Sequence, residues 1–123
     1  MININIKSKN FEMTPETEEY INSKISSVEK FLQMSQEENV LVEFEVEQST
    51  HHKKGEVYRA EANLSVRGKL FRGDSTDYDV RTAIDNVRDQ IEKQIRRSKT
   101  KRFELVEKGA RIIKNILRRN NNG

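Results

Sequence analysis

Two segments of the sequence repeat apolar residues every three or four positions, and this repeat strongly limits the fold. The first segment contains Ile21, Ile25, Val28 and Leu32, and the second contains Val80, Ile84, Val87, Ile91 and Ile95. Side chains at these spacings lie on one face of an α-helix. Thr14 and Pro15 precede the first segment and are typical of a helix start. The pattern predicts two amphipathic helices, the first ending near Gln33 and the second beginning near Thr76 or Asp77.

Four other segments alternate apolar and polar residues with a period of two, which is the pattern of a strand with one buried face. They are residues 1–7, 39–49, 58–66 and 69–75. The last three are joined by short connections, which favours antiparallel pairing. Because each strand is apolar on one side only, both helices are expected to cover the same face of the sheet. The sequence predicts an α+β two-layer sandwich of order β-α-β-β-β-α, with a four-stranded sheet.

Positive charge is concentrated in the C-terminal part of the chain. Residues 1–50 contain 4 basic and 10 acidic side chains, whereas residues 51–123 contain 19 basic and 10 acidic ones. Such asymmetry indicates a polyanionic partner, either a nucleic acid or an anionic membrane surface. The alternative is a charged face that only keeps the protein soluble.

The basic side chains of the second helix favour a nucleic-acid partner. At about 100° per residue, four of them lie on one flank of the apolar stripe and two on the far side. The flank carries Arg81, Arg88, Arg96 and Lys99, and the far side carries Lys93 and Arg97. Lysine and arginine bind phosphates with release of counterions, and arginine can do so with two hydrogen bonds. Since Phe103 is the one aromatic candidate among these cations, recognition of folded RNA by its shape and backbone is expected.

No catalytic or metal-binding pattern stands out in the sequence. There is no cysteine, and the adjacent His51 and His52 would point apart beside two lysines. Glu43, Glu45 and Glu47 would line the exposed side of a strand rather than act as a catalytic pair. We therefore expect no enzymatic activity, no cofactor and no metal. Without a membrane-spanning run or a recognisable secretory signal, a cytoplasmic location is expected.

Two sequence blocks, and the order of elements between them, resemble a known family. The blocks are MININIKSKNFEMTPETEEYINSKISSVEKF at residues 1–31 and AIDNVRDQIEKQIRRSKTK at residues 83–101. Over roughly residues 1–102 the chain resembles the ribosome hibernation-promoting factor and ribosome-associated inhibitor family, which has this fold. The resemblance implies binding to 16S ribosomal RNA of the 30S subunit or 70S ribosome, over the channel for messenger RNA and A/P-site transfer RNA. Translation would be blocked by occupation of this site, without catalysis, in stationary phase or stress.

The resemblance also assigns the ribosomal RNA contacts to basic residues. The matching positions are Lys24, Lys30, Arg88, Lys93, Arg96, Arg97, Lys99 and Lys101. Charge alone adds Arg81 and Arg102, and Arg81 stands where the family often has an aromatic residue. These ten residues form the predicted contact set.

Residues 1–102 are predicted to form the ribosome-binding domain, and residues 103–123 a basic linker or tail. KTKRFELVEKGA at residues 99–110 resembles the start of the linker in long-form members, whose further C-terminal domain dimerises and joins two ribosomes into a 100S particle. The chain is therefore expected to be the N-terminal domain of a long-form member, with a short form that carries a tail as the alternative. The resemblance implies a monomeric isolated domain and a homodimeric intact long form. Whether residues 103–123 form a second basic helix or an arm that orders on a partner stays open.

Two other interpretations remain open. The basic surface also fits a general double-stranded RNA-binding domain. A module that docks on protein, for instance a modulator of a transcription factor, is compatible with the same fold, because a fold by itself does not define a function.

Overall fold

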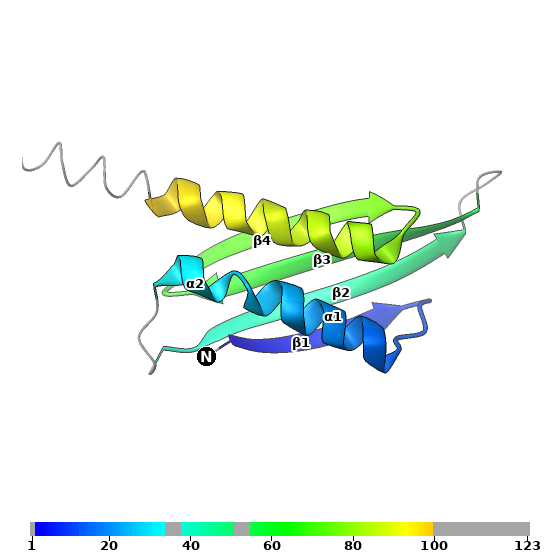
Figure 1. Cartoon of the computed structure of the whole chain (residues 1–123), viewed down its shortest axis with the longest axis horizontal. Coiled ribbons are helices and arrows are strands. Elements are labelled where there is room, and N and C mark those ends of the chain that lie inside the picture. Colours follow the sequence, from blue (N-terminus) through cyan, green and yellow to red (C-terminus); the bar gives the residue numbers. More distant parts are fainter. Residues whose placement is uncertain (1, 34–37, 51–54, 100–123) are drawn as a thin grey trace, which may run out of the picture.

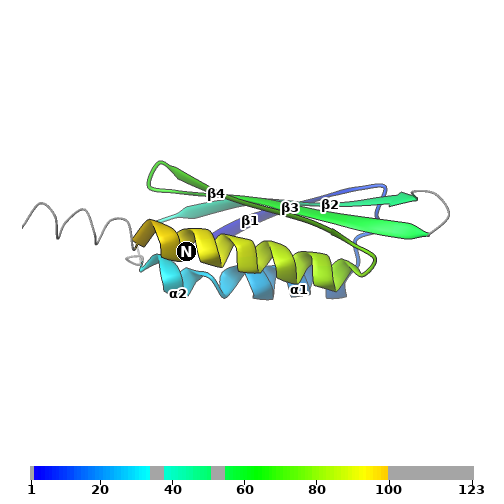
Figure 2. The same cartoon turned by 90° about the horizontal axis from the view of Figure 1, so that it is seen from above.

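The computed structural model describes residues 2–33, 38–50 and 55–99. In this part of the chain, four strands form one sheet and the helices lie together on one of its faces (Figure 1 and Figure 2). The strands are β1 (Ile2–Lys9), β2 (Val40–Thr50), β3 (Glu56–Val66) and β4 (Lys69–Asp77). The helices are α1 (Pro15–Ser26), α2 (Glu29–Leu32) and a helix at residues 80–99, here called the long helix.

The sheet has the strand order β1-β2-β3-β4. β1 and β2 are parallel, with α1 and α2 in the connection between them, whereas β2–β3 and β3–β4 are antiparallel. The predicted α+β sandwich and the antiparallel pairing of its last three strands are confirmed. β3 begins at Glu56 and β4 reaches Asp77, so both strands are about two residues longer than the alternation alone predicts.

The core lies between the sheet and the helices. Alternate residues of β2 and β3, among them Phe44 and Leu64, face it and are buried. Both predicted helix stripes are buried as well, with Val80 only partly so. In the described segments no polar or charged residue is buried. Burial of a valine, leucine, isoleucine or phenylalanine side chain stabilises a fold by about 1.5–3 kcal/mol, so this core fixes which helix faces point outward.

The first predicted helix is broken in two, which the apolar spacing did not indicate. α1 ends at Ser26, and the backbone N–H of Val28 bonds the carbonyl of Ile25, three residues back, at 3.1 Å. The hydroxyl of Ser27 donates to the carbonyl of Lys24 at 2.5 Å. Serine side chains that bond the preceding turn compete with the helical ladder, and serine pairs are common at kinks. The single helix expected up to Gln33 is therefore corrected to α1 followed by the short α2.

The long helix begins later than Thr76 or Asp77, because β4 continues through Asp77. Asp79 precedes its first helical residue, and its carboxylate accepts hydrogen bonds from the hydroxyl of Thr82 at 2.8 Å and the backbone N–H of Arg81 at 3.4 Å. An aspartate in this position accepts hydrogen bonds from groups of the first turn. Its negative charge is also attracted by the positive end of the helix dipole. The predicted start is thus corrected to residue 80.

The long helix also covers the outer edge of β4. The Gln90 side chain accepts from the backbone N–H of Asp74 at 3.0 Å and donates to its carbonyl at 2.7 Å, and Gln94 pairs with Arg72 in the same way. A methyl group at Gly73, between these two residues, would lie 2.8 Å from the carbonyl oxygen of Val87. The two amides therefore replace a neighbouring strand, and the glycine permits the close approach.

Candidate nucleic-acid interface

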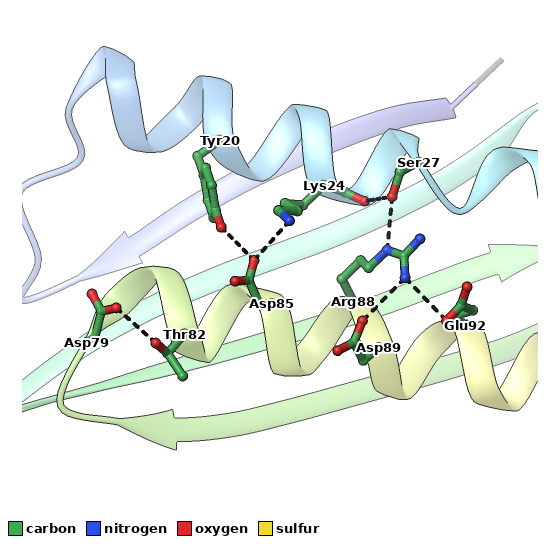
Figure 3. Close-up of polar contacts among 9 residues, drawn as sticks. All are labelled: Tyr20, Lys24, Ser27, Asp79, Thr82, Asp85, Arg88, Asp89 and Glu92. Carbon is green, nitrogen blue, oxygen red and sulfur yellow. Dashed lines mark hydrogen bonds and ion pairs between the residues drawn. The ribbon is translucent and has the colours of Figure 1, made fainter.

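α1 and α2 lie beside the long helix (Figure 1 and Figure 2). Along this line, polar and aromatic side chains of the two sides contact one another. We call this row of side chains the helix seam. Its members are Tyr20, Lys24, Ser27, Lys30 and Phe31 from α1, α2 and the turn between them, and Arg81, Asp85, Arg88, Glu92 and Arg96 from the long helix. Hydrogen bonds, ion pairs and cation–π contacts join the two sides of the seam, several of them drawn in Figure 3.

One cluster of the seam is centred on Tyr20. Its hydroxyl donates to Asp85 Oδ1 at 2.6 Å, and Lys24 Nζ lies 3.5 Å from the same oxygen (Figure 3). The hydrogen bond to Asp85, followed by burial, raises the pKa of Tyr20 to about 12, since ionisation would break the bond beside a carboxylate. The ring also lies under two cations, with Arg81 Cζ 5.0 Å and Lys24 Nζ 5.5 Å from its centroid.

Arg88 ties the seam to the break between α1 and α2. Its Nε donates to Ser27 Oγ at 2.9 Å, and its Nη1 lies 3.2 Å from carboxylate oxygens of both Asp89 and Glu92 (Figure 3). Its side chain is only 17% exposed. Arg88 belongs to the predicted contact set, but its Nε and Nη1 donors are used within the protein, where they hold the helices together.

A second cluster is centred on Phe31, where three cations from two helices meet one ring. Arg96 Cζ lies 4.8 Å, Lys30 Nζ 5.1 Å and Arg88 Cζ 5.9 Å from the ring centroid. These distances are within the range of cation–π attraction. Phe31 and Tyr20 were not predicted as site residues, because both belong to the first helical segment while most of the cations belong to the second.

The structure therefore brings part of the predicted contact set together. Lys24, Lys30, Arg81, Arg88 and Arg96 all lie at the seam. Lys93 and Arg97 are exposed on the long helix away from the core, and Lys99 is half-buried in its last described turn. Lys101, Arg102 and Phe103 lie outside the described residues.

Positive charge collects at one end of the helical layer. α1 and the long helix run in the same direction, so their C-terminal ends lie at the same end of the domain (Figure 1). Residues 90–99 contain four basic side chains and one acidic, whereas residues 15–23 contain three acidic and no basic ones. Cations near helix C-termini are favoured by the helix dipole. The end that carries Lys30, Arg96 and Lys99 is the part of the layer suited to phosphate groups.

The open face of the sheet has a different character, because several of its charged side chains are paired with one another. Arg59 bonds Glu61 at 3.0 Å and Asp74 at 3.3 Å, and Arg72 lies 2.8 Å from the second oxygen of Glu61. Glu43 accepts a hydrogen bond from Asn5 at 3.1 Å. Exposed pairs of this kind contribute little stability, at most about 1 kcal/mol each. This face therefore carries charges of both signs that partly neutralise one another, and it does not continue the cationic end.

The described residues contain no group of three or more histidine, cysteine, aspartate or glutamate side chains able to hold a metal ion, and no helix long and apolar enough to cross a membrane. His51 and His52 lie outside the described ranges. Glu43 and Glu45 are exposed on β2, with Glu47 half-buried.

Comparison with known proteins places the chain in a family. A family model described as sigma 54 modulation protein / S30EA ribosomal protein matches residues 4–102. The chain belongs to this family. The predicted resemblance to ribosome hibernation factors is confirmed, since S30EA-family relatives carry that name.

Two of these relatives show how much of each protein is shared. The ribosome hibernation promotion factor of Lactococcus lactis subsp. cremoris (strain MG1363) is 29% identical over 101 residues, which is 82% of this chain and 51% of that protein. The ribosome hibernation promoting factor of Klebsiella oxytoca is 29% identical over 98 residues, 80% of this chain and 94% of that protein. The chain spans about half the length of the first three curated relatives that it matches.

Two solved structures share the fold of this chain. The crystal structure of the Thermus thermophilus Protein Y N-terminal domain has a TM-score of 0.62 at 24% identity, covering 78% of this chain and 96% of that one. A ribosomal subunit interface protein from Coxiella burnetii has a TM-score of 0.58 at 18% identity, covering 81% and 99%. At these identities the likeness establishes the architecture.

Proposed function

We propose that this S30EA-family domain is a ribosome hibernation factor that acts in the cytoplasm. It binds 16S ribosomal RNA of the 30S subunit over the messenger RNA and A/P-site transfer RNA channel, and it inhibits translation by occupation, without catalysis, in stationary phase or stress. The isolated domain is proposed to act as a monomer, and residues 103–123 as a linker or tail. An intact long form would be a homodimer. The single observation that best supports RNA binding is the convergence of five cations along the helix seam.

The geometry of the seam supports contact with an RNA backbone. The cations come from three helices that are anchored by an apolar core, so the backbone positions from which they project are fixed before binding. Each cation that meets a phosphate releases counterions, and about four contacts predict a slope of log affinity against log salt near −3 to −4. Nothing in such binding requires a sequence-specific contact with a base edge.

Co-sedimentation with vacant 30S subunits at several salt concentrations tests the proposal. The informative variant carries Lys30→Glu and Arg96→Glu, two exposed positions at the cationic end. It is expected to weaken binding at least about tenfold, because two attractive charges become repulsive. The matched control carries Lys7→Glu and Lys9→Glu, which make the same charge change at exposed positions of β1.

The control is expected to stay within about threefold of the unsubstituted protein, since distant exposed charges are largely screened. Equal binding by both double variants would refute the assigned surface. A protein that does not sediment with 30S subunits at low salt, or that leaves cell-free translation unchanged when in excess, would refute the function itself.

A second candidate function is favoured by the family description, which also names modulation of sigma 54. In that case the domain would dock on a protein, and pull-down from a ribosome-depleted lysate would recover a transcription factor. A general double-stranded RNA-binding domain would instead bind simple duplexes with an affinity that rises with duplex length, which a gel-shift series would reveal.

A further inference from the structure

Phe31 has an unusual position for a phenylalanine in a proposed RNA-binding surface. It packs partly against the core, yet three side-chain cations lie within 6 Å of its ring centroid. Lys30 reaches the ring from α2, while Arg88 and Arg96 reach it from the long helix. The ring is thus the point where positive charge from both sides of the seam meets.

Three like charges so close together repel one another unless other groups hold them. The carboxylate of Glu92 bridges the two arginines, with one oxygen 3.2 Å from Arg88 Nη1 and the other 3.6 Å from Arg96 Nη2. The negative face of an aromatic ring attracts cations without hydrogen-bonding them, so it restricts their positions without itself occupying an N–H donor. A carboxylate and a ring together can therefore hold the three cations in place despite their mutual repulsion.

An open surface hollow adjoins this cluster. It is lined by Ser26, Ser27, Glu29, Lys30 and Gln33. Lys30 belongs both to the lining of the hollow and to the group around the ring. Lys30 therefore connects the hollow with the cluster on the α2 side.

We propose that Phe31 is a positioning residue, which arranges Lys30 and Arg96 as the phosphate-contacting end of the seam, with the largely buried Arg88 bracing the ring from the long helix. This inference rests on the proposed function. Phe31 touches the cations rather than RNA bases, so it differs from the stacking aromatics of single-strand binders. Its contribution is pre-organisation, which raises affinity by reducing the side-chain freedom that is lost on binding.

Replacement of the ring at constant charge tests this role. Phe31→Leu keeps an apolar side chain against the core but removes the ring, while Phe31→Tyr keeps the ring. Phe11→Leu is the matched control, because Phe11 is also partly buried and its ring meets a tyrosine, Tyr58, edge-on at 5.9 Å. Binding to 30S subunits is measured for each variant over a salt series, and thermal unfolding is followed in parallel.

Phe31→Leu is expected to weaken 30S binding about threefold to tenfold. The slope of log affinity against log salt should become shallower by the amount that about one phosphate contact contributes. Phe31→Tyr and Phe11→Leu are expected to stay within about twofold of the unsubstituted protein. Arg96→Ala should weaken binding less in the Phe31→Leu background than alone, because the two residues act through one contact. Equal losses for Phe31→Leu and Phe11→Leu, or an unchanged salt slope for Phe31→Leu, would overturn the inference.

Two further measurements separate this inference from the proposed function. In the free domain, NMR signals of the Arg88 and Arg96 Nε–H groups should shift in Phe31→Leu and not in Phe11→Leu. Elution from heparin, a ribosome-free polyanion, should move to lower salt for Phe31→Leu. Failure of the unsubstituted protein to bind 30S subunits refutes the ribosomal function. Unchanged arginine signals and unchanged heparin elution in Phe31→Leu refute the positioning role.

Discussion

Arg88 Nε donates a hydrogen bond to Ser27 Oγ at 2.9 Å, although the two residues are 61 positions apart in sequence. Ser27 lies where α1 ends, and Arg88 lies near the middle of the long helix. The contact therefore fixes the break between α1 and α2 against the long helix. It also distinguishes two kinds of cation in the seam, since Arg88 is 17% exposed and Arg96 is 64% exposed.

Arg88→Ala is predicted to destabilise the domain. The substitution removes the donors used by Ser27, Asp89 and Glu92, and a loss of this kind lowers the free energy of unfolding by about 1–3 kcal/mol. Lys93→Ala, at an exposed position five residues later, should change it by less than about 0.5 kcal/mol. Urea denaturation measures both. Equal stability of the two variants would show that Arg88 does not hold the helices together.

Ser27→Ala is predicted to loosen the helix break. It removes a hydrogen bond to the Lys24 carbonyl and another from Arg88, and should lower the free energy of unfolding by about 1–2 kcal/mol. Ser26→Ala changes the adjacent, exposed serine and serves as the control, with an expected effect below about 0.5 kcal/mol. Chemical denaturation compares the two. A larger effect at position 26 than at position 27 would contradict the prediction.

Tyr20→Phe should reveal the high pKa of Tyr20. In a spectrophotometric pH titration, the difference between the unsubstituted protein and Tyr20→Phe is expected to be centred near pH 12 rather than near 10, because the phenol donates to Asp85. A difference curve centred near 10 would mean that the hydrogen bond does not form in solution.

The same pKa shift predicts how stability depends on pH. The folded protein keeps the Tyr20 proton up to a higher pH than the unfolded chain does, since the folded pKa is raised. The stabilising contribution of Tyr20 relative to Tyr20→Phe is therefore complete below pH 10 and is lost as the pH rises from 10 toward 12. Denaturation of both proteins at several pH values checks this sign. A difference in stability that grows over this interval would contradict it.

Removal of the two glutamines that cover β4 should promote self-association. Gln90→Ala with Gln94→Ala exposes the N–H and C=O groups of Arg72 and Asp74, and an uncovered strand edge is a template for pairing with another chain. Asn86→Ala is the control, because Asn86 bonds the side chain of Ser75 and not the strand backbone. Sedimentation velocity should show concentration-dependent association in the double variant only. Association of both, or of neither, would refute the covering role.

Periodicity in the sequence was sufficient to predict the layers of this fold. The spacing of Ile21 and Ile25, and of Ile84, Val87 and Ile91, follows directly from which helix face is buried. Alternation predicted the strands for the same reason. Such patterns reflect burial of apolar surface, which is the main driving force of folding, so they persist whatever the details of each contact.

The break at Ser27 and the roles of the seam residues depend on contacts between distant parts of the chain. Ser27 is held by Arg88, and the ring of Phe31 is surrounded by two arginines of the long helix. A helical projection places cations around one helix, but it does not say which side chains of another helix face them. The double serine at 26–27 was the one local signal for the kink.

The parallel direction of α1 and the long helix has a consequence for how the domain approaches a charged partner. Their peptide dipoles add, and acidic residues at the helix starts with basic residues at the ends enlarge the separation of charge. A body with such an electric moment experiences a torque in the field of a polyanion before any atoms touch. The domain would therefore approach the partner with its cationic end in front, so that a larger share of collisions leads to binding. Ionic strength should then act on the rate of association far more than on the rate of escape.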